Sequence, residues 1–227
     1  MSTFADRLLR FLTSFPLPAT LPEEVEALSP YQQPTPLALF TQFAERYYTG
    51  DQPRVAVLGI NPGRLGNGRT GVAFTDPVAL AAWGIDNDLP RRREPSSEFM
   101  QEVVLAMGGP QAFYYNFFVG SLYPLVLLRH GLNYNFYDSP AVTAALWPTI
   151  QDSLRRQVEE VGLARHAVIC LGRRNGQYLT KLNQELALFD EIIVLDHPRY
   201  LMQYKRKALA GNIDRYREVL QKVQVAP

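Results

Sequence analysis

Three polar side chains, Asn61, Ser121 and His197, are spaced so that they could act together. Each follows a run of apolar residues with the length and composition of a buried strand. Ligands bind beyond the carboxyl ends of the strands in an open α/β sheet, so we expect these side chains to meet at one edge. An Asn before Pro is a common turn former, and a single His at a strand end is more often structural than catalytic. Their joint placement is therefore what indicates a site.

Several familiar kinds of site do not fit these residues. The glycine-rich stretch Gly59–Gly71 lacks the Gly-Lys-Ser/Thr of a phosphate-binding loop, and its glycines lack the spacing of a dinucleotide fingerprint. Ser121 is not in a G-x-S-x-G nucleophile elbow. No pair of histidines is spaced for a metal on a helix. We therefore expect no metal and no cofactor, and a site that works by hydrogen bonding.

The composition is that of one globular domain, and we expect residues 1–227 to form it with 1–24 as a helical extension. No apolar run reaches about 18 residues, which predicts no contact with a membrane and a cytoplasmic location. The single cysteine, Cys170, excludes an internal disulfide and a multi-cysteine metal site. It lies in an apolar run, where a buried and inert thiol is expected.

The formal net charge of +1 rules out a strongly electropositive protein. Only four of the 23 basic residues are lysines, and arginine suits bidentate contact with phosphate, although a genome rich in G and C produces the same bias. The positions of the basic residues along the chain are more informative than the net charge. Small basic groups occur at 91–93 and at 199–207, both beside predicted loops.

The elements that must position these residues alternate between strands and helices. The strands are predicted at Val55–Leu58, within Phe113–Leu128 with an end near Ser121, at His166–Leu171 and at Glu191–Leu195. The helices are predicted at Ala5–Phe15, Pro36–Tyr48, Val78–Trp83, Glu98–Met107, Ser139–Val161 with a restart at Pro148, Gln177–Leu188 and Ile213–Val223. We expect Asp76, and Ser96 or Ser97, to cap two of these helices, and 16–36 to wrap the surface. This alternation predicts an α/β fold, a three-layer αβα sandwich around a mostly parallel four-stranded sheet.

At the site residues the sequence resembles the uracil-DNA glycosylase superfamily, in particular its single-strand-selective monofunctional branch and an uncharacterised bacterial subgroup. The match lies in the segments GINPGRLG at 59–66 and TGVAF at 70–74. Weaker similarity extends from about Glu24 through 118–125 to His197-Pro198 and the last helix. The resemblance implies a monofunctional DNA glycosylase that hydrolyses the N-glycosidic bond of uracil or a related damaged base, flipped out of single-stranded or duplex DNA. It also implies a monomer that acts in the bacterial cytoplasm on nucleoid DNA.

The resemblance also implies a role for each matching residue. Asn61 would hold the attacking water, His197 would stabilise the departing base anion, and Phe74 would stack on the flipped base. The other residues expected to surround the base are Gly59, Ile60, Pro62, Gly63 and Ser121. The residues expected to contact DNA are Arg64, Arg69, Arg199, Tyr200, Met202 and Lys205. No lysine lies in the matched motifs to form a Schiff base, which agrees with a monofunctional enzyme.

Two departures from the family pattern bear on specificity. Ser121 stands where the family has a pyrimidine-reading asparagine, and a single hydroxyl cannot reproduce the paired donor and acceptor of an amide. The family's His-Pro-Ser-Pro segment reads His197-Pro198-Arg199-Tyr200. We expect weak or absent excision of uracil and selectivity shifted to another damaged base. The alternative is a catalytically weak nucleic-acid or nucleobase-binding protein on the same fold.

Overall fold

The centre of the molecule is a parallel sheet of four strands in a computed structural model that describes residues 2–224. In spatial order the strands are β3 (Phe117–Ser121), β2 (Arg54–Gly59), β6 (Leu163–Leu171) and β7 (Ile192–Leu195). Every residue of β2 is buried, because this strand pairs on both sides and is covered on both faces. The predicted α/β fold with a parallel four-stranded sheet is confirmed.

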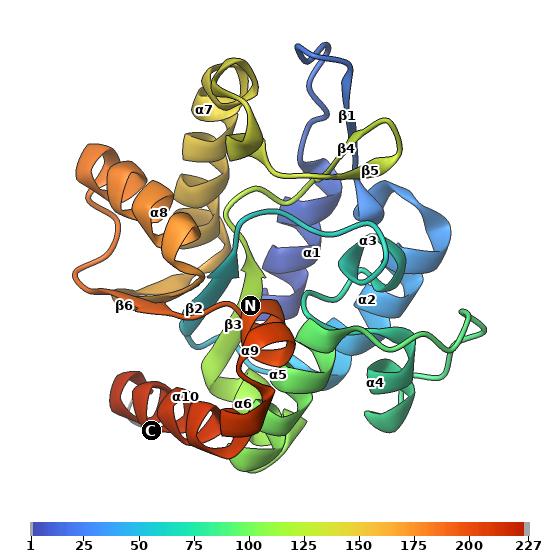
Figure 1. Cartoon of the computed structure of the whole chain (residues 1–227), viewed down its shortest axis with the longest axis vertical. Helices are drawn as coiled ribbons and strands as arrows, with labels where there is room; N and C mark the ends of the chain where they lie inside the picture. The colour runs from blue at the N-terminus through green and yellow to red at the C-terminus, as the bar shows by residue number, and fades with distance from the viewer. Residues whose placement is uncertain (1, 225–227) are drawn as a thin grey trace.

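Helices flank this sheet on both sides, with α7 and α8 above it and α5, α6 and α10 below it in the view of Figure 1. The helices are α1 (Phe4–Ser14), α2 (Pro34–Tyr47), α3 (Asn67–Thr70), α4 (Pro77–Ala82), α5 (Pro95–Ala106), α6 (Pro110–Asn116), α7 (Pro140–Arg156), α8 (Arg173–Leu186), α9 (Pro198–Tyr204) and α10 (Leu209–Val223). The N-terminal helix α1 places Phe4, Leu8 and Phe11 in the same buried cluster as the sheet.

A second, antiparallel sheet was not expected. It is formed by β1 (Val25–Leu28), β4 (Val126–Arg129) and β5 (Leu132–Tyr134), in the order β1-β4-β5. The turn between β4 and β5 is His130-Gly131, and both residues have positive φ, 49° and 71°, as a two-residue hairpin turn requires. The segment 16–36, expected to wrap the surface, thus contributes an edge strand.

Three local predictions were wrong for identifiable reasons. The apolar run at 113 begins as a helix, because Pro110 starts α6, which ends at Asn116. Helix α5 begins at Pro95, so Ser96 and Ser97 lie inside it, and the Ser97 hydroxyl instead accepts a hydrogen bond from the backbone N–H of Asp76. Helix α7 runs through Pro148 without a restart, because this turn is exposed and water can satisfy the carbonyl that proline leaves free.

Candidate active site

An open cleft of about 1010 Å³ lies at the carboxyl ends of the parallel strands. Gly59 at the end of β2 pairs with Ser121 at the end of β3, and His197 follows β7 by two residues. Asn61, Ser121 and His197 all line this cleft, although each comes from a different connection after a strand. The sheet thus brings together the three side chains that the sequence singled out.

The Asn61 amide is held by the last residue of β5 and by the turn that follows this strand. Its Nδ2 donates to the carbonyl of Tyr134 at 3.0 Å, and its Oδ1 accepts from the N–H of Phe136 at 3.3 Å. These two partners settle which atom of the amide is nitrogen, because one is an acceptor and the other a donor. One N–H and one lone pair of the amide stay available to a ligand or a water. An amide held at both ends suits a group that must position a molecule rather than accept its proton.

Phe74 forms an aromatic wall of the cleft and depends on two glycines. A Cβ at Gly59 would lie 3.0 Å from the Phe74 ring, so the ring packs directly on the backbone at the end of β2. Gly71 has φ of 72°, and a Cβ there would lie 2.4 Å from the carbonyl of Pro36. The buried Thr70 hydroxyl lies within hydrogen-bond distance of the carbonyls of Val72 and Thr75, at 3.1 and 3.0 Å, and so shapes the turn. Phe74 itself has φ of 53°, an uncommon conformation that this packing maintains.

His197 is a neutral hydrogen-bond donor in this site. Its Nδ1 accepts from the backbone N–H of Arg199 at 3.1 Å at the start of α9, so we assign the ring proton to Nε2. Burial, and secondarily the charge of Arg199, lowers the pKa of His197 to about 4. The His197 and Phe74 rings lie 5.6 Å apart between centroids. An imidazole N–H therefore stands beside an aromatic face.

Asn61, Phe74 and His197 suit the hydrolysis of a bond whose leaving group is a flat ring that gains negative charge. A leaving group that gains negative charge can be stabilised by the Nε2–H of His197, while Asn61 holds a water and Phe74 supports a flat ring. Burial raises the pKa of the Cys170 thiol to about 12, so this thiol is no nucleophile. Among residues 2–224, no group of three or more His, Cys, Asp or Glu side chains is placed to hold a metal ion.

A model of the uracil DNA glycosylase superfamily matches residues 46–224. The chain belongs to this superfamily. It is a DNA glycosylase, a hydrolase of N-glycosidic bonds, and its substrate is DNA with a damaged base. The alternative of a weak binding module is not favoured.

A solved structure of high similarity, described as the crystal structure of wild-type Pedobacter heparinus SMUG2, agrees with this placement. It is 34% identical to the chain, with a TM-score of 0.93, and the match covers 98% of this chain and 99% of that one. No curated protein matches the sequence.

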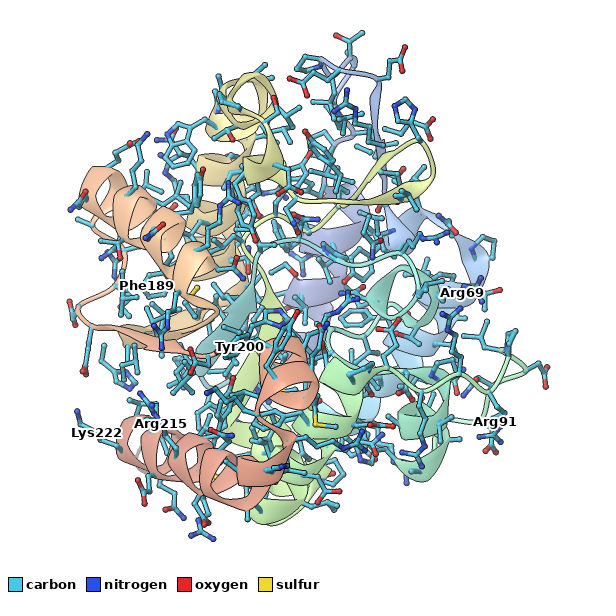
Figure 2. The ribbon with its side chains drawn as sticks, viewed as in Figure 1. Arg69, Arg91, Phe189, Tyr200, Arg215 and Lys222 are labelled. Atoms are coloured by element: carbon cyan, nitrogen blue, oxygen red, sulfur yellow. The ribbon has the colours of Figure 1, made fainter. Side chains whose placement is uncertain are left out.

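Most residues expected to form the glycosylase site line the cleft. They are Gly59, Ile60, Asn61, Pro62, Gly63, Arg64, Phe74, Ser121, His197, Arg199 and Tyr200. Arg69 and Lys205 are exposed but lie outside it. Met202 is 7% exposed and packs in the core, so its expected contact with DNA is not supported. Helix α9 turns Met202 inward, whereas Tyr200, labelled in Figure 2, stays 42% exposed.

The sequence interpretation missed groups that line the cleft or hold its side chains. The end of the hairpin β4–β5 and the turn after it supply the partners of Asn61, and Asn133 of β5 accepts a hydrogen bond from the N–H of Arg64 at 2.9 Å. The His-Gly turn between short apolar segments was the available signal for this hairpin. Glu94 also lines the cleft beside Gly66, and burial, and secondarily Asp76, raises the pKa of its carboxyl. Nothing in the sequence around Glu94 indicates this position.

Proposed function

We propose that this glycosylase removes uracil or a related deaminated base that has been flipped out of DNA into the cleft. The observation that carries the proposal is the fixed Asn61 amide, which shares its cleft with the neutral His197 donor and the Phe74 ring. In this assignment Asn61 holds the water that attacks the sugar, and Nε2–H of His197 stabilises the base anion as it departs. Phe74 stacks on the extruded base.

Extrusion of a base costs a few kcal/mol, least for a damaged or unpaired base, and the protein must offset this cost. Arg199 and Tyr200 lie at the cleft, and the Tyr200 ring rests 5.4 Å from that of Tyr204. We assign Tyr200 to fill the gap left by the base and Arg199 to contact the strand. Arg69 and Lys205 would contact DNA only outside the cleft, and the enzyme would act on the DNA of the bacterial nucleoid.

The test is release of a base from oligonucleotides that contain uracil, hypoxanthine, xanthine or 5-hydroxymethyluracil, followed by cleavage of abasic sites in hot alkali. We expect strand breakage with at least one of these bases. Asn61→Ala and His197→Ala should each lower the single-turnover rate by roughly 10²-fold or more and change DNA affinity only a few-fold, because both groups act in the transition state.

Asn116→Ala is a suitable control, because Asn116 precedes β3 and lies at the opposite end of the sheet, where it bonds within its own helix. This variant should keep the rate of the natural protein. Salt-sensitive DNA binding without release of any of the four bases would overturn the proposal and favour a binding protein.

A further inference from the structure

A small cavity of about 20 Å³ lies next to Ser121 on the inner side of the cleft. Four residues border both spaces, so the cavity adjoins the base site; they are Pro62, Asn67, Ala73 and Ser121. A volume of roughly 10 to 15 Å³ suffices for one water, provided that polar groups surround it. The cavity thus has the size of a single water site at the floor of the proposed base pocket.

Gln157 lines this cavity, and its amide oxygen is buried without a hydrogen-bond partner in the portion of the chain that the structure describes. Its side chain is 1% exposed, and its Oε1 has no hydrogen-bond partner within residues 2–224. Its Nε2 donates to the carbonyl of Ser121 at 3.2 Å and to the hydroxyl of Ser153 at 3.1 Å. These contacts fix the orientation of the amide, because the Ser121 carbonyl can only accept. A buried acceptor without a partner loses its hydration and gains nothing in return, so a partner at this atom is favoured.

A turn of π-helix at the end of α7 positions Gln157 at the cavity. Helix α7 ends at Arg156, and Gln157–Val161 form one turn of π-helix. Such turns re-aim side chains and occur frequently at functional sites. The Ser121 hydroxyl, in turn, makes no hydrogen bond within the described part of the chain, and it borders both the cavity and the cleft.

We propose that Gln157 is a specificity-determining positioning residue, which with the Ser121 hydroxyl holds one water at the floor of the base pocket. The water donates one hydrogen to Gln157 Oε1, and its remaining hydrogen and lone pair reach the base. Ser121 and the water together then offer a donor and an acceptor, the pair that a serine alone cannot supply. The bases that fit are those with an N–H beside a keto oxygen. This inference rests on the proposed function of the cleft.

The first test is a high-resolution crystal structure of the natural protein and of Gln157→Leu. We expect a water within about 3 Å of both Gln157 Oε1 and Ser121 Oγ in the natural protein, and no water there in the variant. A cavity without density for a water in the natural protein overturns the proposal. This measurement needs no activity, so it decides the matter even if no base is released and the proposed function fails.

The second test compares single-turnover rates on uracil and on 4-thiouracil, whose sulfur is a poor acceptor in place of one keto oxygen. The preference for uracil should fall by roughly 10-fold in Gln157→Leu, since the site no longer reads the keto group. Ser121→Ala should lower the preference similarly, and the double variant should add little, because both side chains hold one water.

Gln151→Leu is the matched control on helix α7, which leads into the turn that carries Gln157, because the Gln151 amide bonds only to Glu185 in the described chain. It should leave the preference unchanged. An equal fall of both rates in Gln157→Leu, with an unchanged preference, would mean that Gln157 is only structural and would overturn the proposal.

Discussion

The protonation state of His197 follows from its contacts. Its Nδ1 accepts the N–H of Arg199, and a protonated ring would lose that hydrogen bond and gain a charge beside an arginine. The sequence indicated that His197 belongs to the site, but not that it is neutral. Neutrality arises from burial and from a backbone donor two residues along the chain, which only the folded structure defines. A neutral donor can stabilise a base anion without first taking up a proton.

This arrangement predicts how stability depends on pH. The pKa of His197 is about 4 in the folded protein and about 6.5 in the unfolded chain, so between these values the unfolded chain binds more protons. The free energy of unfolding should therefore fall as the pH is lowered from about 6.5 to about 4. His197→Asn, which cannot titrate, should lose less stability over this range. Urea unfolding of both proteins at pH 7.5 and pH 4.5 measures the difference, and equal losses would contradict the assignment.

At the scale of elements, the sequence predicted the strands of the parallel sheet and missed the short strands of the antiparallel sheet. The four parallel strands could be predicted because each is a buried apolar run between polar loops. The run from Phe113 to Leu128 could not be divided, because apolar residues in helix α6 and in two different sheets leave the same pattern. The antiparallel sheet has strands of only three or four residues, too few to show an alternation. Yet the segment 134–136 that holds Asn61 begins at the end of this sheet.

Glu23 anchors that segment from the turn before β1. Its carboxylate accepts from the Ser139 hydroxyl at 2.5 Å and from the Tyr134 hydroxyl at 3.3 Å, on either side of Phe136. We expect Glu23→Ala to loosen 134–136, which should lower protection of the Phe136 N–H from hydrogen exchange and slow base release several-fold. The free energy of unfolding should fall by about 1 kcal/mol, because the Glu23 side chain is partly exposed. Hydrogen exchange and single-turnover rates measure these effects.

Glu26→Ala is the control for this experiment, because Glu26 is an exposed residue of β1, the strand that follows Glu23, and has no ion pair in the described chain. It should change neither quantity. Unchanged protection of the Phe136 N–H in Glu23→Ala would show that the hairpin holds Asn61 without Glu23.

At the scale of the whole molecule, charge is distributed unevenly although the net charge is only +1. Six arginines line the cleft, namely Arg64, Arg92, Arg93, Arg173, Arg174 and Arg199, against the carboxylates Glu94 and Asp196. Arg173 pairs with Asp196 at 3.1 Å, which leaves the others to attract phosphates. The sequence identified the group at 91–93 but could not show which of its members face the site. No helix of residues 2–224 is long and apolar enough to cross a membrane.

This concentration of arginine predicts the salt dependence of DNA binding. Each phosphate contact contributes about 0.7 to 0.9 to the slope of log affinity against log salt, so the double variant Arg92→Ala/Arg93→Ala should lower the slope by roughly 1.5. The double variant Arg215→Ala/Lys222→Ala removes the same charge from α10, which Figure 2 shows at the lower left, away from Tyr200 at the centre. It should leave the slope unchanged. Fluorescence anisotropy with labelled DNA from about 50 to 200 mM salt measures both. If the α10 double variant lowers the slope as much as Arg92→Ala/Arg93→Ala does, DNA binds by overall charge and not along the cleft.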